Sequence, residues 1–215
     1  MRLCYLIAFL FYITNFKCAK NTIFDHALSN LSEYDFFEKP LKNHIPKKDV
    51  IPYEIASPLF SDYAEKMRYI RVPKGFKILL DDENNFIYPE NTYLIKTFYY
   101  YSDIRDQHSK KHIIETRILK NTSKGWLSFP YVWNENQTDA KLNLAGARIS
   151  ASWTHFDGNP IEILYSVPNM NQCKNCHTLN NIQKPIGPKI RNLNHNLPIK
   201  MEFKISLRNG SLLDF

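Results

Sequence analysis

The stretch YLIKTFYYY, residues Tyr93–Tyr101, decides the fold of this chain. It is filled with aromatic and β-branched residues, which favour extended strands. Similar runs follow at Ile113–Lys120 and Trp126–Trp133, and turn-forming residues separate them. The pattern predicts a protein built mainly from β-strands.

Further strands are expected on both sides of this stretch. The candidates are Tyr69–Val72, Lys77–Leu80, Lys141–Leu144, Arg148–Trp153 and Ile161–Val167. The sequence Asp157-Gly158 before the last of them is typical of a hairpin turn. No repeat of roughly 20 to 50 residues is visible, which argues against a propeller or solenoid. We therefore expect one β-sandwich-like domain over residues 53–168.

The segment before this domain has a different character. Apolar spacing predicts a short helix within His26–Phe37, and the lysine- and proline-rich stretch Leu41–Ile51 is typical of a linker. A second short helix is predicted over Ser61–Met67. Residues 20–52 should thus form a helical arm and linker.

The N-terminus has the pattern of an export signal. Arg2 precedes an apolar run from Leu3 to Phe16 that contains no charge and is short for a membrane span. We expect residues 1–19 to be a signal peptide that directs the protein to the periplasm. The alternative is an N-terminal membrane anchor, either uncleaved or lipidated at Cys18.

The cysteines point to one kind of chemistry. Of the four in the chain, Cys4 and Cys18 lie in or beside the signal, which leaves only Cys173 and Cys176 for the folded protein. These two stand in the sequence CKNCH, residues 173–177. This spacing is the attachment signature of c-type haem, in which the thiols add to the vinyl groups and the histidine, here His177, ligates the iron.

Two other interpretations use the same residues. A zinc site would combine the two thiolates with imidazoles such as those of His177 and His195, and it would usually need a second ligand pair. A redox-active dithiol would normally lie in an alternating α/β chain, which this sequence does not resemble.

The charge of the chain bears on its partners. The formal net charge is +7, and the basic residues are scattered rather than gathered in runs, which argues against nucleic acid as a partner. A basic group does surround the motif: Lys174, Lys184, Lys189, Arg191 and Lys200. It is either a solvated face or a docking surface for an acidic redox partner.

Several strings in the chain are similar to those of a known family. They are LSEY (31–34), SPLFSDYAEK (57–66), LIKTFYY (94–100), ETR (115–117), YVWNE (131–135), QTDA (137–140) and VPN (167–169). Together they resemble a family of exported bacterial proteins that joins a β-rich domain to a C-terminal c-type cytochrome motif. The resemblance covers roughly residues 31–194 and implies a shared architecture without a known substrate. Members often carry two haem motifs, whereas this chain has one.

The residues after the motif are similar to those of small soluble cytochromes c. Thr178, the turn Gly187-Pro188 and Leu193 stand in comparable places. In those proteins the proline carbonyl accepts a hydrogen bond from the proximal histidine, so the resemblance implies this role for Pro188. Residues 169–215 would then form a small cytochrome c haem-binding segment.

The sixth iron ligand is the least defined part of that segment. The resemblance implies a methionine about 50 to 60 residues after the motif, but only residues 178–215 follow His177. Met201 leads as a candidate, followed by His195 and the upstream Met170. The alternating pattern from Met201 onward is typical of a strand rather than of the family's helix. We interpret this as a truncated segment or as a shifted reading frame.

These observations favour an electron carrier over an enzyme. The expected function is single-electron transfer by one covalent haem to a periplasmic partner. Two alternatives are a β-sandwich binding or accessory module whose haem is structural or vestigial, and an oxidoreductase that uses an open iron position.

Overall fold

The computed structural model describes residues 26–83, 85–179, 182–193, 205–206 and 212–213. The predicted signal peptide or anchor, residues 1–19, lies outside this part of the chain. Among the described residues, no helix combines the length and apolar character that crossing a membrane requires.

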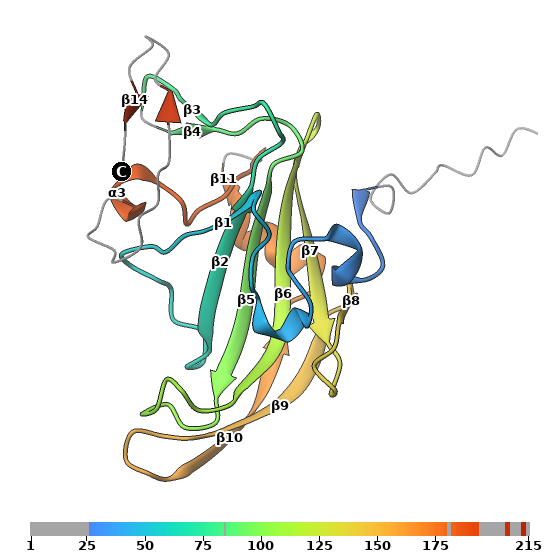
Figure 1. Cartoon of the computed structure of the whole chain (residues 1–215), viewed down its shortest axis with the longest axis vertical. Helices are drawn as coiled ribbons and strands as arrows, with labels where there is room; N and C mark the ends of the chain where they lie inside the picture. Colours follow the sequence, from blue (N-terminus) through green and yellow to red (C-terminus); the bar gives the residue numbers. More distant parts are fainter. Residues whose placement is uncertain (1–25, 84, 180–181, 194–204, 207–211, 214–215) are drawn as a thin grey trace, which may run out of the picture.

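A six-stranded antiparallel sheet forms the centre of the molecule (Figure 1). Its strands, in spatial order, are β1 (Val50–Pro52), β2 (Glu65–Arg71), β5 (Tyr93–Tyr101), β6 (Lys111–Thr122), β7 (Gly125–Trp133) and β8 (Ala140–Leu142). The stretch Tyr93–Tyr101 is β5, which pairs with β2 on one side and β6 on the other. The prediction of a mainly β protein is confirmed.

The other strands form smaller units. The strands β9 (Ala147–Thr154) and β10 (Pro160–Val167) make a hairpin, and β11 (Thr178–Leu179) pairs with β12 (Ile182–Gln183). A small sheet has the order β14 (Leu212–Leu213), β13 (Ile205–Ser206), β3 (Leu79–Leu80) and β4 (Phe86–Ile87). In the described part of the chain, the second β layer over the central sheet is therefore a two-stranded hairpin rather than a full second sheet.

The described helices are short. They are the 3-10 turns η2 (Leu31–Tyr34) and η3 (Leu41–Asn43) and the α-helices α2 (Met170–His177) and α3 (Ile190–Leu193). The helix expected within His26–Phe37 is reduced to η2, which ends at Asp35 in a left-handed conformation.

The helix predicted over Ser61–Met67 is wrong. Asp62 and Tyr63 have positive φ angles of 47° and 63°, which a right-handed helix does not contain. Glu65 and the two residues after it belong to β2, where they pair with β5. Pairing with the central sheet thus overrides the local helical preference of this segment.

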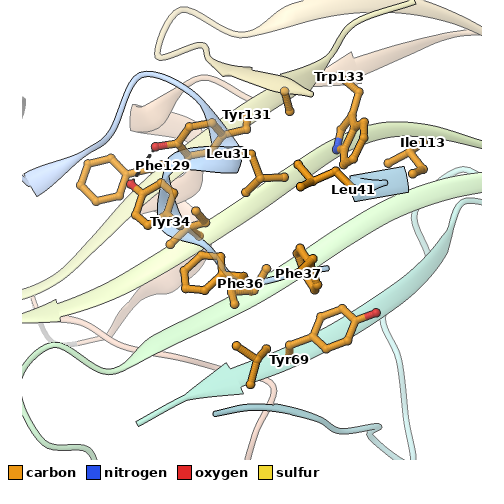
Figure 2. Packing of buried hydrophobic residues seen from close by; sticks show 14 of the residues in the cluster. Leu31, Tyr34, Phe36, Phe37, Leu41, Tyr69, Ile113, Phe129, Tyr131 and Trp133 are labelled. Carbon is orange, nitrogen blue, oxygen red and sulfur yellow. Dashed lines mark hydrogen bonds between the residues drawn. The ribbon is translucent and has the colours of Figure 1, made fainter. Parts of the chain in front are cut away.

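The N-terminal arm covers one face of the central sheet, which we call the arm face. Leu31, Tyr34, Phe36 and Phe37 from the arm are buried against alternate side chains of β5, β6 and β7. Figure 2 shows Phe36 and Phe37 packed between Tyr34 and Tyr69. The Tyr34 and Tyr131 hydroxyls lie 2.7 Å apart, so the arm is also fixed by a buried polar contact.

A buried polar chain joins the arm to β5, β6 and β7. The Nε2 atom of His44 lies 3.0 Å from the Thr97 hydroxyl, which lies 2.8 Å from the Thr116 hydroxyl. The indole N–H of Trp133 donates to the same Thr116 oxygen at 3.0 Å. Burial lowers the pKa of His44 to about 4, so the imidazole is neutral at pH 7.

This burial predicts a specific loss of stability in acid. Unfolded His44 binds a proton near pH 6.5 and the folded residue only near pH 4, so the free energy of unfolding should fall as the pH falls through this window. The full loss is roughly 3 kcal/mol. Urea unfolding at several pH values between 7 and 5 should show a steeper dependence for the wild type than for His44→Asn. Equal slopes for the two proteins would contradict the assignment.

Candidate haem-attachment site

The motif CKNCH forms the C-terminal part of helix α2. The helix begins with a reciprocal cap: the Asn169 side chain accepts from the Gln172 backbone N–H at 2.9 Å, and the Gln172 side chain accepts from the Asn169 N–H at 2.8 Å. The backbone N–H of Met170 also donates to the carbonyl of Leu144 at 3.1 Å. The start of the helix is thus held both by its own sequence and by the loop after β8.

Cys173 and His177 occupy the same side of α2. They are four residues apart, so their side chains lie one turn from each other. Cys173 is buried, while His177 is partly exposed. The backbone of Cys176 belongs to the same helix, and its side chain is not among the parts that the structure describes.

The ring of His177 has a defined partner. Its Nδ1 atom lies 3.1 Å from the carbonyl oxygen of Lys184, and the backbone N–H of Lys184 donates to the carbonyl of His177. A carbonyl at Nδ1 fixes the neutral tautomer that leaves Nε2 as the metal-binding nitrogen. Burial lowers the pKa of His177, and the charges of Lys96 and Arg117 lower it further.

This arrangement fits a covalently bound haem. The helix places the buried thiol of Cys173 one turn before the imidazole of His177. The Nδ1 atom of this imidazole is hydrogen-bonded to a backbone carbonyl, as is typical of histidines that bind a metal through Nε2. The structure differs from the expectation in the identity of that acceptor, since Lys184 stands four residues before Pro188. A haem-binding role for Pro188 stays a prediction.

The other predicted ligands lie elsewhere. Met201 and His195 are outside the described residues, and Met170 begins α2 seven residues before His177. Within the described part of the chain, no three His, Cys, Asp or Glu side chains gather as a metal-binding group. The zinc interpretation, which would combine the two thiolates with imidazoles such as those of His177 and His195, stays a prediction. Of the basic group around the motif, Lys174, Lys184 and Lys189 are exposed.

Sequence reasoning missed the polar residues of the sheet that lie close to the motif. They are on the face opposite the arm, which we call the motif face, because Figure 1 shows α2 behind the sheet and the arm in front of it. Glu115 is fully buried there and accepts two hydrogen bonds from Arg117, at 2.8 and 2.5 Å, and one from the Tyr165 hydroxyl at 2.6 Å. The available signal was a charged residue at an inward-facing position of an apolar strand.

The comparisons with known proteins add no relative. No protein-family model, no curated protein and no solved structure matches the chain.

Gly146 supports the start of α2 through its lack of a side chain. Its φ angle is +81°, and a Cβ atom there would lie 2.8 Å from the Val167 carbonyl oxygen and 3.0 Å from the Asn169 nitrogen. Gly146→Ala should therefore lower the free energy of unfolding in two ways. The steric clash of the added Cβ should cost roughly 1–3 kcal/mol, in addition to the cost of placing alanine at a positive φ angle. It should also shift the amide NMR signals of Asn169 to Cys173.

The matched control for this substitution is Gly75→Ala. Gly75 has a similar φ angle of +85° but no atom within 4 Å of the added Cβ, so only the backbone strain of about 1–2 kcal/mol applies. Equal losses of unfolding free energy in the two variants would show that the close contact of Gly146 with the start of α2 does not contribute to stability.

The buried carboxylate of Glu115 yields a second comparison. Glu115→Gln leaves the Arg117 guanidinium without its anion and should lower the unfolding free energy by about 3–5 kcal/mol. Tyr165→Phe removes the hydrogen bond to Glu115 and the longer one from Arg117, at 3.4 Å, but keeps the ion pair, so a loss of about 1.5–3 kcal/mol is expected. Urea unfolding at pH 7 measures both. A Glu115→Gln loss no larger than that of Tyr165→Phe would contradict this account of the site.

Proposed function

We propose that this protein is an exported c-type cytochrome that carries one covalent haem and transfers single electrons to a periplasmic partner. The thiols of Cys173 and Cys176 would hold the haem, and His177 would be the proximal iron ligand. The observation that carries the proposal is the contact of His177 Nδ1 with the Lys184 carbonyl, one helical turn after the buried thiol of Cys173. Residues 169–215 would form the haem-binding segment.

The residues around the motif support this chemistry. A bound haem supplies one-electron redox chemistry at its iron. The Lys184 carbonyl orients the His177 ring and holds its Nδ1 proton. The charges of Lys96 and Arg117 act on the same ring, and nearby positive charge favours the redox state that has gained an electron.

The exposed surface supports a charged partner. Lys174 and Lys184 are exposed in α2 and in the turn that holds the His177 ring, and Lys189 is exposed immediately before α3. Such a basic rim would attract an acidic redox protein and speed its encounter in a salt-dependent way.

A second candidate function is a binding or accessory module whose haem is structural. It is favoured by an exposed aromatic patch on the loop before β2 and on the tip of the β9–β10 hairpin. Phe60 and Phe156 are 71% and 64% exposed, and Tyr63 contacts both Phe60 and His155. Large exposed apolar side chains that gather in one place typically mark an interaction surface.

Covalent attachment provides the direct test. Protein from cells that possess haem-attachment machinery should retain its haem through denaturation and acid extraction, because thioether bonds survive both treatments. Cys173→Ala and Cys176→Ala should each shift the absorption band of the denatured haem, since one vinyl group then stays unreacted. Asn175→Ala, between the two cysteines, is the control and should leave the band unchanged.

The alternatives give different results. Colourless protein that contains zinc would contradict the proposal and support the zinc site. A His177→Ala protein that loses electron transfer supports the carrier. If the wild-type haem exchanges no electrons with redox proteins and the His177→Ala variant keeps a binding partner, the accessory module is favoured.

A further inference from the structure

The motif face of the central sheet carries a row of cations across three strands. The register places Arg68 of β2 opposite Lys96 of β5, and Lys96 opposite Arg117 of β6. Side chains at directly opposed positions lie about 5 Å apart at their Cβ atoms, and like charges there are destabilising. We call these three residues the cationic row.

The row lies between two hydrophobic clusters on the same face. Ile70, Leu94 and Leu119, two residues along each strand on one side, belong to one cluster. Phe98, two residues from Lys96 on the other side, belongs to a second cluster with side chains of the β9–β10 hairpin. Three positive charges are therefore held at a largely apolar surface, where an uncompensated charge costs several kcal/mol.

The described residues compensate this charge only in part. Glu115 pairs with Arg117, but the ion pairs found among the described residues include neither Arg68 nor Lys96. Arg68 is 9% exposed, and its buried Nη2 atom has no hydrogen-bond partner in the described structure. Burial, followed by the charges of Arg68 and Arg117, lowers the pKa of Lys96 to about 7.

A second donor without a partner lies beside the motif. The Nε2 atom of Gln183 is buried and, among the described residues, finds no acceptor. Gln183 pairs through its backbone with Thr178, the residue after His177. Both of the buried side-chain atoms that lack partners in this part of the chain are therefore donors, one in the cationic row and the other beside the motif. Buried donors without acceptors are rare in native proteins, so both atoms are available to an acceptor from outside the described residues.

We propose that the cationic row is a binding site for carboxylate groups, with Arg68 and Lys96 as the principal donors. The side chain of Arg117 keeps 27% of its surface exposed, so the row is open to solvent at its β6 end. The carboxylates have two sources with the same chemistry: the propionate groups of a haem held by the motif, or a free dicarboxylate. The first source rests on the proposed function, and the second does not.

Two of the three charges in the row act on the motif, which supports the first source. The charges of Lys96 and Arg117 both act on His177, and Arg117 also interacts electrostatically with Cys173. An anionic group carried by a cofactor on α2 would thus meet the positive potential of the row. Guanidinium groups bind carboxylates through two parallel hydrogen bonds, and the Nη2 atom of Arg68 has no other acceptor among the described residues.

The test begins with the full chain purified without haem. Succinate, titrated into the millimolar range against NaCl of equal ionic strength, is the probe. Saturation should raise the Tm by roughly 5 °C. In the haem-loaded protein the succinate shift vanishes if propionates fill the row and persists if the ligand is a free dicarboxylate. Either result supports the site and identifies its source.

Variants of the row should change stability in opposite directions in the two states. Without an anion, Arg68→Gln and Lys96→Gln should each raise the Tm, because they relieve like-charge repulsion. Both should abolish the succinate shift, and both should lower the Tm of the haem-loaded protein if the haem supplies the carboxylates. Lys141→Gln, which replaces an exposed cation on β8, should leave every value unchanged.

The outcomes separate this site from the proposed function. Haem retention is measured independently, so protein that attaches no haem but keeps the succinate shift refutes the cytochrome and supports the carboxylate site. The site is overturned if succinate shifts no Tm and the row variants do not differ from Lys141→Gln in either state. Lys96→Gln keeps the test valid should Arg68→Gln fail to fold.

Discussion

The alternation of side chains along β5 is the constraint on which the rest of the structure depends. In an extended strand, neighbouring residues point to opposite faces of the sheet. Ile95, Thr97 and Tyr99 therefore lie on the arm face, while Lys96 and Phe98 lie on the motif face. A shift of one residue in the pairing would exchange these two sets and expose both cores.

The two faces are stabilised by different means. The arm face is an aromatic core that also contains a few buried hydroxyl and imidazole contacts. Each side chain in the hydrogen-bonded series His44, Thr97, Thr116 and Trp133 has a partner. The motif face combines apolar clusters with buried charges, and among the residues that the structure describes there, Arg117 alone forms an ion pair with a carboxylate. The first face has the properties of a structural core, and the second those of a surface that is prepared for an anionic group.

Parts of this arrangement could be predicted from local sequence. The strands Tyr93–Tyr101, Ile113–Lys120 and Trp126–Trp133 were recognisable because aromatic and β-branched residues prefer extended backbone. The failure at Ser61–Met67 has an equally physical cause. Its second half pairs with β5. In its first half Asp62 and Tyr63 adopt positive φ angles, which helix propensities do not predict.

The sequence by itself determined the chemistry that the motif can offer, since two thiols and an imidazole in CKNCH spacing define a haem-attachment signature regardless of the fold. Only the tertiary structure decided what surrounds that motif. The acceptor for His177 is a backbone carbonyl, which every residue possesses, so the geometry of the turn alone selects Lys184. Arg68, Lys96 and Arg117 are distant in sequence, and strand register alone brings them into one row.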